Sequence, residues 1–182
     1  MKKVLLFSLF LLLSTICVLA YETIIIDFPD GEKWDPVYYK KVGNEALLQY
    51  VPKGETSDNW TRSIVVHSYN HSAYPMNSFM ANNIARLQKA NPTGGYKTIR
   101  MRETDAIVTR CTKDYGKIKG QCEFFRATFA HDGIVTIHYM NKNKTNFMAN
   151  YTLWLEIVRK AKLYNTFYRT ERVLNKAEYF EL

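Results

Sequence analysis

The sequence predicts an α+β protein with a mainly antiparallel, sandwich-like β-sheet, one mid-chain helix and one long C-terminal helix packed on it. Strand-like runs of β-branched and aromatic residues dominate residues 104–140. A helical stripe ends at Asn91-Pro92, and the most regular helical pattern of the chain begins near residue 146. The 182 residues are enough for one domain with a full hydrophobic core.

The other elements are predicted to be arranged around residues 104–140. Three strands are expected there, over residues 105–111, 122–130 and 134–140. A polar loop separates the first two strands, and a tight turn at His131-Asp132-Gly133 separates the last two. Aspartate followed by glycine is a strong hairpin signal, because glycine accepts the positive φ that such a turn needs. The stretch therefore reads as an antiparallel series.

The chain before this stretch contributes further strands, expected over residues 23–28, 34–42, 45–51, 62–69 and 97–102. The second and third of these form a candidate hairpin about Gly43-Asn44 and end at Pro52. The last is short and typical of a sheet edge.

The mid-chain helix is predicted from Pro75 or Asn77 to Ala90. Asn91-Pro92 gives an explicit stop. Its apolar stripe should lie on the sheet and consists of Phe79, Met80, Ile84 and Leu87.

The long C-terminal helix has the most persistent helical spacing in the chain. Thr145 or Asn146 is expected to cap its N-terminus. Basic residues at 159, 160 and 162 suit a helix C-terminus, because they oppose the helix dipole. Its apolar positions are Phe147, Tyr151, Trp154, Val158 and Ala161.

Residues 1–20 have the pattern of a signal peptide: a basic start, an apolar run, and small-residue spacing before Ala20. Cleavage there would leave residues 21–182 as a single domain, with a C-terminal helical arm over residues 165–182. Two alternatives stay open, an uncleaved membrane anchor and a lipoprotein anchored through Cys17. The apolar run is short for a membrane span, and Ile16 stands where a lipoprotein carries a small residue.

Export lowers the number of cysteines from three to two, because Cys17 is removed with the signal peptide. The mature chain then holds the pair Cys111 and Cys122 in a compartment that permits disulfides. These two residues flank the polar loop and are predicted to join across the mouth of the hairpin. A redox-active pair would need the two-residue spacing that is missing here.

Loss of Lys2 and Lys3 lowers the basic count from 25 to 23 against 17 acidic residues, so the net charge falls from +8 to +6. This balance favours an anionic partner. The sequence has no arginine-rich run, and we expect no nucleic acid partner. The expected partner is an unknown protein or an envelope component, or a membrane surface. The candidate contact surface is the set of loop lysines Lys113, Lys117 and Lys119.

Catalytic and metal-binding patterns were weighed against structural ones. Glu55, Asp58 and Trp60 could form a carboxylate and aromatic cluster, but we favour a loop that leads into a strand, with Trp60 packed on the edge of the core. His67 and His71 have metal-ligand spacing only on a helix, and they fall where a strand passes into a loop. We therefore predict no catalytic residue, no metal site and no cofactor.

The order of elements over residues 23–161 resembles the small sandwich folds of the Mog1/PsbP/DcrB type. The segment that runs from Tyr50-Val51-Pro52-Lys53 to Asn59-Trp60-Thr61 is similar to small exported bacterial proteins of unknown function. The resemblance implies a fold and supplies no site residues.

Two functions remain open from the sequence. The first is an exported, non-enzymatic binding or accessory protein of the periplasm or extracellular space, a factor that contacts envelope or host components. The second is a small secreted hydrolase whose site is assembled from distant residues, for which the candidates are Glu55, Asp58, His67 and His138. Whether the protein is an enzyme is uncertain, and the missing nucleophile motifs favour the first function.

Overall fold

The structure is a computed structural model that describes residues 22–29, 31–131 and 133–165. The predicted signal peptide, and the predicted arm beyond residue 165, lie outside the described residues. No helix within the described part of the chain has the length and apolarity needed to cross a membrane. In chain order the elements are β1 (Glu22–Ile25), β2 (Trp34–Val42), β3 (Glu45–Pro52), β4 (Arg62–Asn70), α2 (Met76–Ala90), β5 (Lys97–Met101), β6 (Asp105–Cys111), β7 (Cys122–Ala130), β8 (Gly133–Asn141), α3 (Lys144–Ala149), α4 (Tyr151–Lys160) and β9 (Lys162–Asn165).

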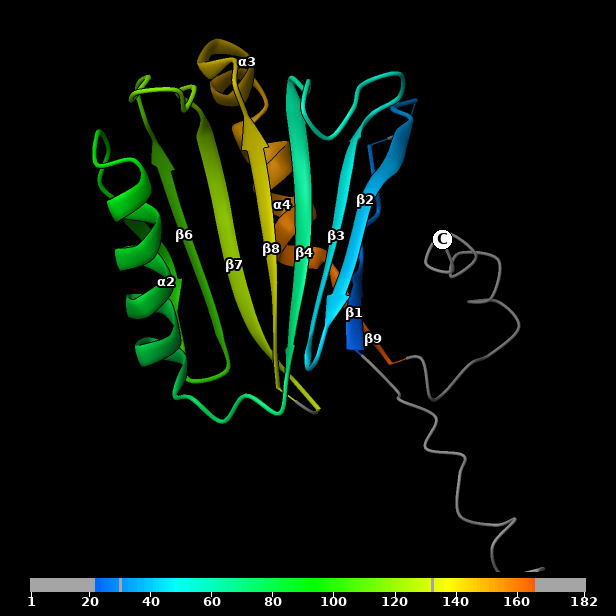
Figure 1. The fold of residues 1–182 in the computed structure, drawn as a ribbon, viewed down its shortest axis with the longest axis vertical. Coiled ribbons are helices and arrows are strands. Elements are labelled where there is room, and N and C mark those ends of the chain that lie inside the picture. The colour runs from blue at the N-terminus through cyan, green and yellow to red at the C-terminus, as the bar shows by residue number, and fades with distance from the viewer. Residues whose placement is uncertain (1–21, 30, 132, 166–182) are drawn as a thin grey trace, which may run out of the picture.

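Seven strands form one antiparallel sheet in the order β2-β3-β4-β8-β7-β6-β5 (Figure 1). The predicted β2–β3 hairpin, the β6-β7-β8 series and the edge position of β5 are confirmed. β1 and β9 pair antiparallel as a separate two-stranded sheet. The α+β class is therefore confirmed, and the second sheet of the predicted sandwich is reduced to two short strands.

The β7–β8 turn holds one position where only glycine fits. Gly133 has a φ of 145°, and a Cβ on it would lie 2.0 Å from the carbonyl oxygen of Tyr69. That carbonyl belongs to β4, which pairs with β8 on the side away from β7. The glycine therefore shapes the turn and also admits the neighbouring strand.

Each face of the sheet is covered by different elements. On one face Met76, Phe79 and Met80 of α2 pack on Phe125 and Ile134, as the predicted helical stripe requires. On the other face α3, α4 and β1 cover the sheet, with a core that includes Phe147, Trp154, Val158, Ile24, Phe124 and Tyr139. Burial of one such large side chain contributes about 2 to 3 kcal/mol.

The single long C-terminal helix that we predicted is replaced by two short ones, α3 and α4, which meet at Asn150. The side-chain amide of Asn150 donates to the carbonyl oxygen of Asn146 at 3.0 Å. Asparagine competes for helix hydrogen bonds in this way, and its own φ of −109° and ψ of 17° interrupt the helix. Phe147 of α3 and Trp154 of α4 both stack on the ring of Tyr139, with centroids 6.0 Å and 4.0 Å away.

The N-terminus of α3 also differs from the prediction. The cap is Asn143, whose side chain accepts a hydrogen bond from the backbone N–H of Asn146 at 2.9 Å. Thr145 and Asn146, which we expected to cap the helix, lie inside its first turn. The helix therefore begins at Lys144, earlier than the apolar spacing indicated.

Candidate functional site

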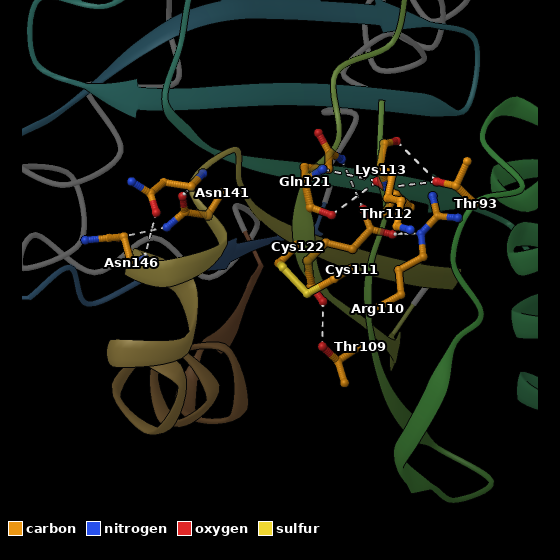
Figure 2. The surroundings of a disulfide bond; sticks show 12 residues. Thr93, Thr109, Arg110, Cys111, Thr112, Lys113, Gln121, Cys122, Asn141 and Asn146 are labelled. Atoms are coloured by element: carbon orange, nitrogen blue, oxygen red, sulfur yellow. Dashed lines mark hydrogen bonds and ion pairs between the residues drawn. A yellow bond between two sulfur atoms is a disulfide. The ribbon is translucent and has the colours of Figure 1, made fainter. Parts of the chain in front are cut away.

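The disulfide joins the ends of two paired strands. Cys111 closes β6, Cys122 opens β7, and the two face each other in the strand register with a Cα–Cα distance of 4.0 Å. The predicted pairing is therefore present in the structure. Figure 2 shows the bond at the base of the β6–β7 loop, beside the residues that hold the loop in place.

The loop beyond the disulfide continues as a hydrogen-bonded hairpin. The backbone N–H of Thr112 donates to the carbonyl oxygen of Gln121 at 2.8 Å, and the N–H of Gln121 donates to Thr112 Oγ1 at 3.1 Å. Nearer the tip, Tyr115 and Ile118 exchange backbone hydrogen bonds of 2.9 Å and 3.0 Å around a turn that contains Gly116 at a φ of 58°. The loop is thus an ordered extension of two strands.

Residues that follow α2 brace this hairpin from the side. The backbone N–H of Lys113 donates to Thr93 Oγ1 at 2.8 Å, and Asn91 Nδ2 donates to the carbonyl oxygen of Lys113 at 3.0 Å. Asn91 is itself buried, and its carbonyl oxygen accepts a hydrogen bond from Arg110 at 3.2 Å. Asn91 therefore both ends the helix and anchors the loop, together with Thr93, which Figure 2 shows beside Lys113.

The structure places Lys113, Lys117 and Lys119 on this one loop, and all three are exposed. Lys119 Nζ pairs with Asp114 Oδ2 at 2.9 Å. The pKa of Asp114 is lowered, chiefly by the backbone hydrogen bond from Gly120 and then by Lys119. Within the described residues, neither Lys113 nor Lys117 forms an ion pair.

Sequence reasoning missed the apolar part of the same surface. The side chains of Tyr115 and Ile118 are 49% and 45% exposed at the tip of the loop. Their alternation with Lys117 about Gly116 is the signal that could have revealed them. We use the name lysine hairpin for the exposed side chains of Lys113, Tyr115, Lys117, Ile118 and Lys119.

A second basic and apolar segment lies at the same end of the molecule, where α3 and the β6–β7 loop both extend beyond the strands (Figure 1). Met148 of α3 is 55% exposed, and Lys144, four residues earlier in the same helix, is exposed too. Lys142 is also exposed and lies over the ring of Trp60, with Nζ 3.9 Å from the ring centroid. This end therefore carries cations on two separate segments.

The candidate hydrolase residues separate into two groups. Glu55 accepts hydrogen bonds from the backbone N–H and the Oγ1 of Thr61, at 2.7 Å and 2.6 Å, so its carboxylate orders its own loop. His67 lies six residues after Thr61 along β4, roughly 20 Å away at the usual strand rise. His67 and His138, by contrast, lie on the same face of two paired strands.

The protein is thus an α+β protein whose disulfide closes a lysine-bearing hairpin at one end of its sheet. A family model that describes an uncharacterised bacterial family matches residues 26–167, and the chain belongs to that family. The match runs from the segment after β1 past the end of β9. No curated protein matches the chain.

Proposed function

We propose that this protein is an exported, non-enzymatic binding protein that contacts the anionic surface of a membrane through the lysine hairpin. The observation that carries the proposal is the pairing of two exposed apolar side chains, Tyr115 and Ile118, with three exposed lysines on one ordered loop. Export is supported by the signal-like residues 1–20 and by the disulfide, which is typical of oxidising compartments.

The composition of the hairpin favours a lipid surface over a purely polar polyanion. Each lysine near an anionic membrane contributes about 1 kcal/mol, and apolar side chains gain further by entering the boundary between headgroups and acyl chains. A polysaccharide would use the lysines and leave Tyr115 and Ile118 exposed. The disulfide and the Thr93 contacts hold the loop in its bound shape, which reduces the entropy cost of binding.

Two finer predictions belong to the same proposal. The likeness to the Mog1/PsbP/DcrB sandwich folds is supported by the order of elements alone. The periplasmic or extracellular location is supported by the residues that predict a signal peptide. Both remain predictions about the mature chain.

The test is co-sedimentation of the mature protein with vesicles of phosphatidylcholine alone and of phosphatidylcholine mixed with phosphatidylglycerol. We expect binding only to the anionic vesicles, and we expect added salt to weaken it. Lys117→Gln should weaken binding about fivefold, because it removes one lysine near the surface. Tyr115→Ser combined with Ile118→Ser should weaken it further at every salt concentration.

The matched control is Lys40→Gln combined with Tyr74→Ser, which removes an exposed lysine and a tyrosine that is 62% exposed away from the hairpin. This variant should bind anionic vesicles as the unmodified protein does. Equal loss in the control and in Lys117→Gln would show that the hairpin lysines have no special role, and would overturn the proposal. Equal binding to both kinds of vesicle would also overturn the proposal.

A further inference from the structure

Helix α2 covers only one side of the sheet face on which it lies. Its buried side chains pack with Val108 of β6 and Phe125 of β7. In Figure 1, α2 lies over the β6 side of the sheet, and no described helix lies in front of β8, β4 and β3. We call this uncovered part the open face, and its half-buried side chains are His138, Met140, Val65, His67, Gln49 and Leu47.

His138 presents unbonded ring nitrogens on the open face. Its ring stacks on Phe125 with centroids 4.0 Å apart, and the strand register places it opposite Val65. Among the described residues, none forms a hydrogen bond with this imidazole. Burial lowers the pKa of His138 to about 4, so near neutral pH the ring offers one donor and one acceptor nitrogen. The ring is half-buried and its nitrogens reach the surface of the open face, so a ligand that lies there can use them.

His67 lies diagonally across the β4–β8 pair from His138, a relationship that separates residues by about 7 to 8 Å. Its Nε2 lies 3.0 Å from Glu45 Oε2, and its ring stacks on Tyr69 with centroids 4.0 Å apart. Two imidazoles and a phenol ring therefore line one strip of the open face.

Arg86 of α2 borders this strip. It is exposed, and its Nη2 donates to Asn83 Oδ1 at 3.1 Å. Burial is the main reason that the pKa values of His67 and His138 are low, and the positive charge of Arg86 lowers both further. The helix geometry agrees with this placement, because Phe79, seven residues before Arg86 and so on the same side of α2, contacts Tyr69 with ring centroids 5.2 Å apart. The ring of Tyr69 in turn lies 4.0 Å from the ring of His67.

The charge that is left over around the strip is positive. Within the described part of the chain no carboxylate forms an ion pair with Arg86. The buried Glu123 pairs with Arg110 at 2.8 Å, and Glu45 faces the neutral ring of His67, so Glu45 is, among the described residues, the one carboxylate set against the cations at this strip. Lys40 of β2, opposite Leu47 in the register, adds a further exposed cation beside the open face.

We propose that the open face binds a small organic anion with an apolar body, whose charged group pairs with Arg86. In this arrangement the N–H of His138 donates to the anionic group, and the apolar body lies across Val65, Leu47 and Met140. His67 lines the site and keeps its Nε2 hydrogen bond to Glu45. This assignment does not depend on the lysine hairpin. The side chains of α2 lie at the edge of the strip. The bound ligand would therefore shield the part of the sheet next to α2 from solvent.

The experiment titrates decanoate, a carboxylate with a short apolar chain, into the mature protein and follows the binding heat and the His67 and His138 ring signals by NMR. We expect saturable binding to one site, with shifts at both histidines. Decyltrimethylammonium, which has the same body and the opposite charge, should bind at least tenfold more weakly. Arg86→Gln should weaken decanoate binding at least tenfold, and Arg86→Lys should retain most of it.

Matched controls separate this site from other surfaces. Arg159→Gln removes an exposed arginine from α4 on the other face of the sheet and should leave decanoate binding unchanged. Tyr115→Ser with Ile118→Ser removes the hairpin tip and should also leave it unchanged. The proposal is overturned if decanoate and 1-anilinonaphthalene-8-sulfonate both fail to bind, or if Arg86→Gln binds them as tightly as the unmodified protein.

Discussion

His138 shows how one half-buried side chain makes stability depend on pH. Its pKa is lowered from 6.5 to about 4, chiefly by burial, so the folded protein keeps the ring neutral over that range. The groups that bear on it electrostatically come from β7, β6, α2 and β4 and are Glu123, Arg110, Arg86 and His67. Between these two pH values the unfolded chain binds more protons at this residue than the folded chain.

The free energy of unfolding should therefore fall as the pH drops from 6.5 to 4. Because the ring is half-buried, we expect His138 to account for about 2 to 3 kcal/mol of that loss. Urea unfolding at both pH values measures it, with His138→Phe as the comparison, since phenylalanine keeps the stacking on Phe125 and does not titrate. A variant that loses as much stability as the unmodified protein would refute this account. His131→Asn, in the exposed turn, is the matched control.

At the scale of single residues, the sequence predicted which charged side chains are exposed better than it predicted which residues lie beside one another in space. Lys113, Lys117 and Lys119 were predictable as a surface, because they share one polar loop between two cysteines. The pairing of His67 with His138 was not predictable. It depends on β4 lying beside β8, and nothing in the local sequence of either strand specifies its partner.

At the scale of elements, Arg126 joins β7 to the end of α4. Its Nε pairs with Asp105 Oδ2 at 2.8 Å, and its Nη1 donates to the carbonyl oxygens of Val158 and Ala161 at 2.8 Å and 2.9 Å. The side chains of Arg126 and Asp105 are only 11% and 13% exposed. The guanidinium therefore satisfies carbonyls that the last turn of α4 leaves without a helical partner.

Arg126→Met should lower the free energy of unfolding by about 2 kcal/mol, because the carbonyls at the end of α4 lose their donor, while Asp105 keeps its ion pair with Arg100. Urea denaturation measures the loss. Arg159→Met provides the control, since Arg159 forms an exposed pair with Glu156 at 3.1 Å and its removal should cost no more than about 0.5 kcal/mol. Equal losses in the two variants would mean that Arg126 contributes no more than a surface pair.

The two C-terminal helices show where periodicity stops being informative. The spacing from Phe147 to Val158 is helical throughout, and it correctly predicted which side chains are buried. It did not predict the break at Asn150, because the spacing of apolar side chains says nothing about the hydrogen bond that the Asn150 side chain donates to the carbonyl oxygen of Asn146. Both ends of the mid-chain helix were predictable, because local sequence signals mark them. Pro75 precedes its first residue, and Asn91-Pro92 follows its last.

At the scale of the whole molecule, β8 pairs with β4 and β7, so the N-terminal hairpin and the disulfide-closed hairpin form one continuous sheet. Local patterns predicted most strands but could not give this order. Gly133 is needed where β8 meets β4, because a residue without a Cβ leaves room for the carbonyl oxygen of Tyr69. The binding surfaces that we propose depend on this arrangement, since it places the lysine hairpin and the open face on one rigid sheet.

The disulfide is predicted to stabilise this sheet without being needed for binding. Closing a loop with a sequence separation of 11 contributes about 3 kcal/mol in the chain-entropy model, so Cys111→Ser combined with Cys122→Ser should lower Tm by about 6 to 12 °C. The backbone hydrogen bonds between Thr112 and Gln121 should keep the hairpin formed, so vesicle binding below Tm should persist. Intact mass spectrometry of the exported protein should give a chain that begins at Tyr21 and lacks the two thiol hydrogens. Detection of free thiols in that chain would contradict the predicted disulfide. Loss of vesicle binding in the double serine variant at unchanged Tm would instead show that the cysteine pair is part of the contact surface.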